Sequence, residues 1–388
     1  MNINTVLARI QTAYQHDCEN PRIAFKADEL PLSYEDINDV WLTDALCSAV
    51  PGGRVVSWRL GEPDNGTTNR RKLYVEYNAE GTAAGLPRAL FCKATHDLQN
   101  RVALGITDAA RREVLFYSQL RQHLTIEAPH CYYAHIDLQS FNSMIVLEDL
   151  TDQVKVFCDH DTPIDLSRAQ SQMRLLAAFH GAGIGDAALR EQVETLPSFT
   201  ELFANTQALG FNMEEGSNNG FLAGESVIPE RLFRRFKEIW PATVRSVAFH
   251  EGVDHTLIHG DVHLKNWYVA GNGEMGLGDW QCSGRGHWGR DLSYTLATAL
   301  RPEDRRRWER DLVQLYLEQL HASGGPQVAF ADGWRIYRHQ LLAALAWWTV
   351  TLSPPAGLPD MQPRDTALEF VRRIAIAADD LDALDALD

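Results

Sequence analysis

The chain lacks the cysteine pattern of a metal-binding or disulfide-stabilised protein. Its six cysteines are scattered over 388 residues, and none forms a C-x-x-C pair. A zinc ribbon and a dense disulfide framework are therefore not expected, and a reducing compartment suits the chain best. The first twenty residues also lack the unbroken apolar core of a signal peptide. We accordingly expect a cytoplasmic protein.

Basic residues and long apolar runs are also scarce. The chain has 36 Lys and Arg against 52 Asp and Glu, which gives a net charge of -16. Such an excess of negative charge repels nucleic acid and anionic membrane surfaces. The longest apolar run, 341–352, is too short to span a bilayer and is predicted to be a buried helix. We expect neither a nucleic-acid partner nor membrane insertion.

The first part of the chain carries most of the β-strand patterns. We predict strands at 55–60, 72–78, 89–94 and 143–150, which are rich in β-branched and aromatic residues and are bounded by turn residues. A helix is predicted at 33–49, where Ser33 and Asp36 form a capping box. Another is predicted from about residue 109, where the sequence REVLFYSQL has helical periodicity.

Helical patterns dominate the rest of the chain. The predicted helices are 165–180, parts of 186–238, 291–300, 303–322, 333–352 and 364–378. This order predicts an α+β fold with two lobes. The sheet-rich N-terminal lobe, with its leading helices, is expected to span residues 1–148, and the helical C-terminal lobe residues 149–388.

One stretch, LIHGDVHLKNWYVAGNGEMGLGDWQ at 257–281, interrupts the helices with a predicted hairpin. Asn272-Gly273 is a strong hairpin signal, because both central residues of a type I′ turn need a positive φ. If these two residues form the loop, residues whose numbers sum to 545 face each other. Asn266 would then lie opposite Asp279, with Cα atoms roughly 4.5 to 5.5 Å apart.

The oxygen atoms of this hairpin suit a hard cation. A carboxylate and an amide oxygen side by side favour Mg²⁺, which takes few protein ligands and leaves room for phosphate oxygens. Asp261 follows the apolar strand TLI and precedes Asn266 by five residues. Its carboxylate could accept a proton from a hydroxyl group that attacks a phosphate.

A zinc site is the competing interpretation of this stretch. His255, His259 and His263 recur at four-residue spacing and would share one face of a helix. Gly260 and the β-branched residues before it disfavour a helix, and the H-E-x-x-H motif is absent. We therefore expect His259 and His263 to hold the loop through hydrogen bonds.

These residues resemble a known superfamily. HGDVHLKN at 259–266 and GDWQ at 278–281 are similar to the H-G-D-x-H-x-x-N and D-[FW]-x motifs of the aminoglycoside phosphotransferase and choline kinase superfamily. The Asp-Trp-Gln ending, together with Lys93 and REVLFYSQL, looks closest to the ecdysteroid-kinase-like branch and its bacterial relatives. The resemblance implies a bilobal, protein-kinase-like fold over roughly residues 50–320.

The resemblance also implies roles for individual residues. Asp261 matches the catalytic base, and Asn266 and Asp279 match the magnesium ligands. Lys93 matches the lysine that holds the α and β phosphates of the nucleotide. Glu113 matches the helical ion-pair partner of that lysine. The expected cofactors are ATP, with GTP as the alternative, and Mg²⁺.

The rest of the implied nucleotide site is less distinctive. The segment VLEDL at 146–150 matches the hinge, where the backbone around Glu148 and Leu150 would bind the adenine. No G-x-G-x-x-G is present. The sequence GEPDNGTTNR takes the place of the phosphate loop, with Gly66 and Thr67 as candidates, although its glycines also suit a plain turn.

We expect an enzyme, an ATP- and Mg²⁺-dependent phosphotransferase that acts on the hydroxyl group of a small molecule. A protein kinase would carry a long activation segment, but only eleven residues separate Asp279 from Asp291, and His263 replaces the lysine of protein kinases. A non-catalytic pseudokinase would have lost the lysine, the base or a metal ligand, and all are present. Asp291 either braces the catalytic loop or caps a helix.

The acceptor is the least determined part of the prediction. Eight of the ten tryptophans lie in the C-terminal lobe, and most are expected to be core residues. If a few line the acceptor pocket, the substrate is an alcohol with a hydrophobic scaffold, and residues 186–235 are the expected cover of that pocket. The alternatives are an aminoglycoside, a choline-like or a hydroxyacyl substrate.

Overall fold

The computed structural model describes residues 3–355 and 360–387, and it divides into two compact units. The N-terminal unit contains the described residues up to His123 together with Ala128–Gln153. The C-terminal unit contains Leu124–Glu127 and the described residues from Val154 onward. The division therefore falls between Gln153 and Val154, five residues after the expected end of the N-terminal lobe.

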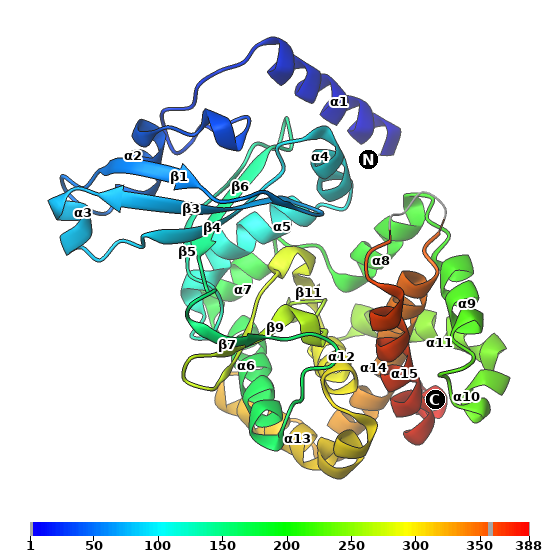
Figure 1. Cartoon of the computed structure of the whole chain (residues 1–388). Coiled ribbons are helices and arrows are strands. Elements are labelled where there is room, and N and C mark those ends of the chain that lie inside the picture. The colour runs from blue at the N-terminus through cyan, green and yellow to red at the C-terminus, as the bar shows by residue number, and fades with distance from the viewer. Residues whose placement is uncertain (1–2, 356–359, 388) are drawn as a thin grey trace. The chain divides into compact units, whose positions relative to one another are not determined.

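The N-terminal unit is built on a six-stranded antiparallel sheet (Figure 1). Its strand order is β1-β3-β4-β6-β5, and the short β2 pairs with β3. The strands are β1 (Val55–Leu60), β2 (Asp64–Asn65), β3 (Asn69–Tyr77), β4 (Ala89–Ala94), β5 (Cys131–Ile136) and β6 (Ser143–Glu148). The predicted strands 55–60 and 89–94 are confirmed at both ends. The sequence analysis did not predict β5.

Helices flank the sheet of the N-terminal unit. They are α1 (Ile3–Glu19), η1 (Tyr34–Asp36), α2 (Asp39–Cys47), α3 (Ala79–Ala83), α4 (Leu98–Ile106), α5 (Ala109–Leu115), the π-helical η2 (Phe116–Leu120) and η3 (Arg121–His123). REVLFYSQL is thus helical as predicted, but it changes from α to π geometry at Phe116.

The single helix predicted at 33–49 is wrong. Ile37 is extended, with ψ 141°, and separates the short η1 from α2. The hydroxyl of Ser33 donates to the carboxylate of Asp36 at 2.8 Å, and no cap hydrogen bond reaches its side chain. The side chain of Asn38 accepts from the backbone N–H of Trp41 and caps α2 instead. The competition of short polar side chains for local partners explains the error.

The two faces of β4 have different partners. Leu90, Cys92 and Ala94 belong to the hydrophobic core that packs β4 against residues of α2 such as Trp41. Because successive side chains of a strand point to opposite faces, Lys93 lies on the other face. The α5 helix contacts β5 and β6, and its Glu113 meets Lys93.

The C-terminal unit is mainly helical and carries two small β elements (Figure 1). The strands β7 (Val154–Phe157), β9 (Trp267–Ala270) and β10 (Met275–Leu277) form one sheet, and β8 (Thr256–Ile258) pairs with β11 (Gly284–Gly286). The helices are α6 (Leu166–Gly185), α7 (Ala187–Val193), α8 (Phe199–Ala208), α9 (Met213–Ala223), α10 (Glu230–Arg234), α11 (Phe236–Ala248), η4 (Phe249–Gly252), η5 (Leu264–Asn266), η6 (Trp280–Cys282), α12 (Gly289–Ala299), α13 (Pro302–Ala322), α14 (Phe330–Leu352), α15 (Arg364–Asp380) and η7 (Ala383–Leu387).

The α14 helix lies at the centre of the C-terminal unit. It contacts α9, α11, α12 and α15, and its side chains from Leu341 to Ala346 are buried. The prediction that 341–352 forms a buried helix is confirmed. None of the helices in the described ranges is both long enough and apolar enough to cross a bilayer. The sheet-rich first unit and the helical second unit confirm the expected α+β fold with two lobes.

Candidate functional site

The hairpin that follows the HGDVHLKN motif has a different register from the predicted one. Met275 pairs with Val269 and Leu277 with Trp267, so the numbers of facing residues sum to 544 and not to 545. The loop has three residues, 271–273, and the backbone N–H of Gly273 donates to the carbonyl of Ala270 at 2.9 Å. Of the two expected turn residues, both within the described ranges, only Gly273 has a positive φ, 92°. A type I′ turn needs a positive φ at both central residues, so this loop is not a type I′ turn.

This register moves the two predicted metal ligands out of direct opposition. The backbone N–H of Gly278 donates to the carbonyl of Asn266 at 2.9 Å, so Asn266 faces Gly278 and Asp279 lies one residue further along. The predicted direct pairing of Asn266 with Asp279 is therefore wrong. Asp279 has a left-handed backbone, with φ 60° and ψ 61°, and begins η6 at the same end of the hairpin.

The donor set at this end of the hairpin fits Mg²⁺. The side-chain amide nitrogen of Asn266 donates to the main-chain carbonyl of Asp261 at 2.7 Å. This bond fixes the amide plane, and the amide oxygen is the atom that Asn266 can offer to a cation. Together with the half-buried carboxylate of Asp279, it supplies the hard oxygen ligands that Mg²⁺ prefers.

The zinc interpretation fails on geometry. Thr256–Ile258 is a strand, β8, and Gly260 has φ 80°, so His255, His259 and His263 do not share a helix. Within residues 3–355 and 360–387, no group of three or more His, Cys, Asp or Glu side chains is arranged to hold a metal ion.

His259 holds the loop formed by residues 259–266 through both of its ring nitrogens. The backbone N–H of Asp261 can only donate, so Nδ1 of His259 accepts from it at 3.2 Å. The proton must then be on Nε2, which donates to the carbonyl of Gly278 at 2.9 Å. Burial lowers the pKa of His259, which favours this neutral form. His259 therefore ties the 259–266 loop to the residue next to Asp279, and the prediction that it holds the loop through hydrogen bonds is confirmed.

Asp291 braces the same loop from α12. Its carboxylate accepts from the backbone N–H groups of His259, at 2.6 Å, and Gly260, at 3.0 Å. Nε2 of His180 lies 3.3 Å from it. Burial works to raise the pKa of Asp291, but the hydrogen bonds to His180 and His259 outweigh burial and hold that pKa below its ordinary value. The structure thus shows the loop brace and not the helix cap.

The carboxylate of Asp261 has donors at both oxygens. The hydroxyl of Tyr294 donates to Oδ1 at 3.0 Å. On the other side, Oδ2 is 3.3 Å from the side-chain nitrogen of Asn266 and 3.4 Å from Nε2 of His263. Burial works to raise the pKa of Asp261, but His263 and Tyr294 outweigh it and hold the pKa well below the usual range. Asp261 is therefore an ionised, oriented carboxylate and not a strong base.

Gly260 is required by the path of this loop. Its φ of 80° is in the left-handed region, where a side chain adds strain. A Cβ atom at this position would also lie 2.6 Å from the carbonyl oxygen of Cys282, which follows the Asp279 motif. The glycine therefore allows two segments of the site to approach closely.

The N-terminal unit brings Lys93 and Glu113 together. Nζ of Lys93 lies 2.5 Å from Oε1 of Glu113, and the two side chains are 11% and 3% exposed. Neither residue is therefore a solvated surface charge. The pair lies on the face of β4 that is opposite to the core formed with α2.

The Gly66 turn lies at the same end of the sheet as Lys93. Asn69 pairs with Ala94, so the turn that precedes Asn69 adjoins the end of β4 just beyond Lys93. The backbone N–H of Gly66 donates to the carbonyl of Thr68, and the side chain of Asn100 donates to the carbonyl of Gly66, both at 2.9 Å. Thr67, at the tip of this turn, is exposed.

Asn69 of β3 and Asn100 of α4 flank this turn, and the sequence analysis missed both. The side-chain oxygen of Asn69 accepts from the backbone N–H of His96 at 2.9 Å, and its nitrogen donates to Asp97 at 2.7 Å. Asn69 thereby joins the start of β3 to the segment that follows β4. The only sequence signal is an asparagine at the edge of a strand, which is common in turns.

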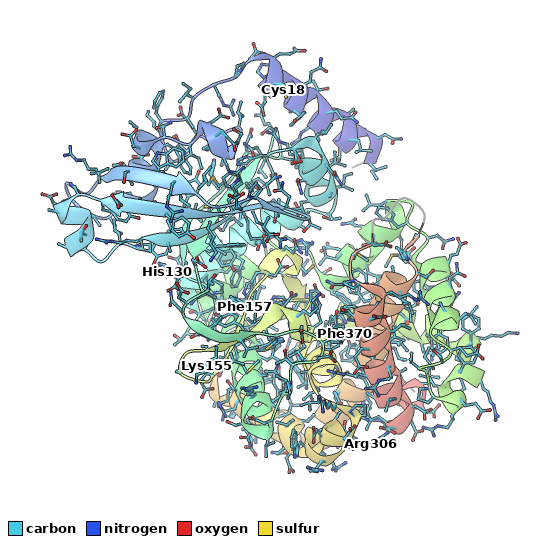
Figure 2. All side chains as sticks on the ribbon, viewed as in Figure 1. Cys18, His130, Lys155, Phe157, Arg306 and Phe370 are labelled. Atoms are coloured by element: carbon cyan, nitrogen blue, oxygen red, sulfur yellow. The ribbon has the colours of Figure 1, made fainter. Side chains whose placement is uncertain are left out.

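The expected hinge residues are further along the sheet. Glu148 pairs with Leu90, three positions from Lys93 along β4, or about 10 Å at the rise of a strand. The backbone N–H of Glu148 already donates to the carbonyl of His130, which Figure 2 labels, at 2.9 Å. The carbonyl of Leu150 accepts from Gln153 at 3.0 Å. These two backbone groups are thus engaged within the N-terminal unit.

The predicted acceptor cover contains a loosely buried helix. No residue of α8 is fully buried, yet Phe199, Leu202 and Phe203 are half-buried. The rings of Phe203 and Trp240 are 5.9 Å apart. The tryptophans of the C-terminal lobe divide evenly into buried residues (Trp267, Trp280, Trp288 and Trp348) and half-buried ones (Trp240, Trp308, Trp334 and Trp347).

The structure thus distributes the predicted site residues over both units. Asp261, Asn266 and Asp279 lie in the C-terminal unit, and Lys93, Glu113, Gly66, Thr67, Glu148 and Leu150 lie in the N-terminal unit. Within each unit, side chains from separate elements meet as described.

Solved structures of low sequence identity are similar to the chain. A putative aminoglycoside phosphotransferase from Ralstonia eutropha JMP134 is 16% identical, with 88% of this chain and 98% of that chain covered and a TM-score of 0.47. The choline kinase LicA from Streptococcus pneumoniae is 12% identical, with 87% of this chain and 98% of that chain covered and a TM-score of 0.43. An ethanolamine kinase from Plasmodium vivax is 11% identical, with 95% of this chain and 94% of that chain covered and a TM-score of 0.46. No curated protein matches the chain.

A family model gives the clearest match. It covers residues 63–324, which is more than half of the chain. The matched range begins before the Gly66 turn and extends beyond α12, so it includes Lys93, Glu113, Asp261 and Asp279. The chain belongs to the ecdysteroid kinase-like family.

Proposed function

We propose that the chain is an ATP- and Mg²⁺-dependent phosphotransferase that transfers the γ-phosphoryl group to a hydroxyl of a small molecule. The proposal rests on the geometry of Asp261. Its carboxylate is ionised, held by Tyr294 and Asn266, and joined through Asn266 to the candidate metal ligands. Phosphoryl transfer suits such a group, because its loose transition state needs an oriented hydroxyl more than a strong base.

The other candidate residues would bind the metal ion and the phosphates of the nucleotide in this reaction. Asn266 and Asp279 would hold the Mg²⁺ ion, which when bound neutralises phosphate charge. Lys93, fixed by Glu113, would contact the α and β phosphates, and the Gly66–Thr68 turn would cover them. Asp261 accepts the proton of the acceptor hydroxyl at its carboxylate as the new O–P bond forms. GTP is the alternative nucleotide.

The acceptor we propose is an alcohol with a hydrophobic scaffold. The support is the half-buried aromatic side chains of Phe199 and Phe203, which lie in the region expected to cover the acceptor, together with the half-buried ring of Trp240 beside Phe203. A polycationic sugar or choline would be recognised by carboxylates and aromatic cages instead.

A direct assay tests the proposal. The purified chain is incubated with ATP or GTP, with and without Mg²⁺, and with a panel of sterol-like alcohols, aryl alcohols, aminoglycosides, choline and hydroxyacyl compounds. We expect ADP release that requires both Mg²⁺ and a hydrophobic alcohol, together with a phosphorylated product detected by mass spectrometry. Thermal stabilisation by nucleotide without turnover on any acceptor would instead indicate a non-catalytic nucleotide-binding protein.

A further inference from the structure

The α12 helix contacts three consecutive residues of the catalytic loop. The guanidinium of Arg290 donates to the carbonyl of Gly260 at 3.3 Å, and the carboxylate of Asp291 accepts from the N–H groups of His259 and Gly260. Tyr294 reaches the next residue, Asp261, through its hydroxyl. Arg290 and Asp291 precede Tyr294 by four and three positions, the two spacings that bring side chains together on a helix surface, so α12 fixes this loop from a single rigid element.

The first two contacts fix the backbone, whereas Tyr294 fixes a side chain. Rotation about the Cα–Cβ and Cβ–Cγ bonds of Asp261 would still move its carboxylate if only Asp291 and Arg290 acted on the loop. The hydroxyl of Tyr294 donates to Oδ1 at 3.0 Å, opposite to the oxygen that faces Asn266 and His263. Donors on both oxygens leave the carboxylate one orientation.

The environment of Tyr294 holds its own ring in place. The ring is fully buried, and the guanidinium of Arg290 lies 4.7 Å from its centre. The His263 ring is 6.4 Å away and is backed by Trp348 and by Phe370 of α15, which Figure 2 labels. A buried phenol without a partner is costly, so Tyr294 keeps its bond to Asp261.

We propose that Tyr294 is a positioning residue for phosphoryl transfer: its hydroxyl sets the orientation of the Asp261 carboxylate toward the acceptor hydroxyl. The inference rests on the proposed function. Because Tyr294 is fully buried and bonded to Asp261, it would act through that carboxylate and not by contact with the nucleotide or the acceptor. Its removal should therefore lower the rate of the chemical step and leave nucleotide binding unchanged.

Tyr337 provides a matched control in the same unit. It is also fully buried, and its hydroxyl donates to a carboxylate, that of Glu309, at 2.9 Å. Tyr294→Phe and Tyr337→Phe each remove one buried hydroxyl from one carboxylate, so both should cost similar stability. Only the first carboxylate belongs to the catalytic loop.

Steady-state kinetics compare the two variants with the wild type. Because a misplacement of about 1 Å can cost on the order of 100-fold in rate, we expect Tyr294→Phe to lower kcat by about tenfold or more. The KM for ATP and the thermal shift with ATP and Mg²⁺ should stay at wild-type values. Tyr337→Phe should retain wild-type kcat. Equal kcat values for the two variants, or a Tyr294→Phe protein that fails to fold while Tyr337→Phe folds, would overturn the proposal.

Crystal structures supply a test that does not depend on turnover. The Asp261 carboxylate should keep its rotamer in the wild type and in Tyr337→Phe and should rotate in Tyr294→Phe. An unchanged rotamer in Tyr294→Phe overturns the inference even if the wild type phosphorylates alcohols. Conversely, a wild type that turns over no acceptor refutes the proposed function and leaves the rotamer comparison as the measure of the positioning contact.

Discussion

The ammonium group of Lys93 lies 2.5 Å from the carboxylate of Glu113, and the Glu113 side chain is only 3% exposed. Lys93→Ala should therefore affect stability as well as nucleotide use. Breaking a buried pair from one side costs roughly 3 to 5 kcal/mol, because the remaining charge has lost its partner. We expect a lower Tm and a lower kcat/KM for ATP.

The double variant Lys93→Met, Glu113→Gln separates these effects. It removes both charges, so the Tm should recover most of the loss while kcat/KM stays low. Thermal unfolding and ATP kinetics of both variants check this expectation. Wild-type kcat/KM in either folded variant would exclude Lys93 from the nucleotide site.

Asp261→Asn keeps the shape of the side chain but removes the proton acceptor. We expect kcat to fall by on the order of 100-fold or more, with nucleotide affinity little changed, since general-base groups contribute about that much. Isothermal titration with a non-hydrolysable ATP analogue and single-turnover kinetics measure the two quantities. A large loss of affinity would place Asp261 among the groups that bind the nucleotide.

The corrected hairpin register changes what is expected of Asn266. Its side chain donates to Asp261 and is also a candidate metal ligand. Asn266→Ala should therefore raise the Mg²⁺ concentration needed for half-maximal turnover and also lower kcat at saturating Mg²⁺. Asp279→Asn, which retains a residue tolerant of the left-handed backbone, should raise the required Mg²⁺ concentration further, because it removes a negatively charged ligand. Magnesium titrations at saturating ATP measure the Mg²⁺ requirement of both variants. A wild-type Mg²⁺ requirement in both would refute the metal assignment.

Gly260→Ala tests the close approach within the site. The added Cβ would lie 2.6 Å from the carbonyl of Cys282. Gly85 is a matched control, because its φ of 72° is close to the 80° of Gly260 but its Cβ would meet nothing within 4 Å. Both variants carry left-handed strain of about 1 to 2 kcal/mol. Only Gly260→Ala should also lose activity, and similar activities would show that the contact is unimportant.

The buried His250 should make folding stability depend on pH. Burial lowers the pKa of His250 from 6.5 to about 4. Its Nδ1 accepts from the backbone N–H of His287 at 3.0 Å, and its Nε2 lies 3.0 Å from the side-chain oxygen of Gln340, so the neutral ring is the form that fits.

The sign of this dependence follows from the unfolded chain. Below pH 6.5 the unfolded chain binds a proton that folded His250 does not, so stability present above pH 6.5 is lost as the pH falls toward 4. At about 1.4 kcal/mol per pH unit, this residue should contribute a loss of about 2 kcal/mol between pH 7 and pH 5. Urea unfolding of the wild type and of His250→Gln, which does not titrate, measures the difference. Equal losses in both proteins would assign the effect to other groups.

Local sequence signals predicted the elements of the site better than their exact contacts. The strands around Lys93 and the loop at Asp261 follow from patterns of β-branched residues, turn residues and polar spacing, which act over a few positions. The hairpin register did not follow, because Asn272-Gly273 is compatible with both a two-residue and a three-residue loop. The choice depends on whether Asn272 adopts a positive φ, which the surrounding structure decides.

The sequence patterns did not predict the contacts between residues that are far apart in the chain. Tyr294 lies 33 positions from Asp261, and nothing in its local sequence distinguishes it from an ordinary aromatic residue of a buried helix. Asn100 holds Gly66 across 34 positions. Such partners are set by how helices pack on loops, and no periodicity within one segment reports that packing. The capping-box error at Ser33 has the opposite cause, since there a local competitor replaced the expected bond.

The left-handed backbone of Asp279 restricts which residues can replace this candidate metal ligand during evolution. With φ 60° and ψ 61°, the position tolerates glycine and asparagine at little cost, whereas a β-branched or bulky residue would strain the entry to η6. Descendants that abandon catalysis while keeping the fold should therefore carry Asn or Gly at position 279. Inactive homologues with other residues there should show compensating changes in the hairpin loop.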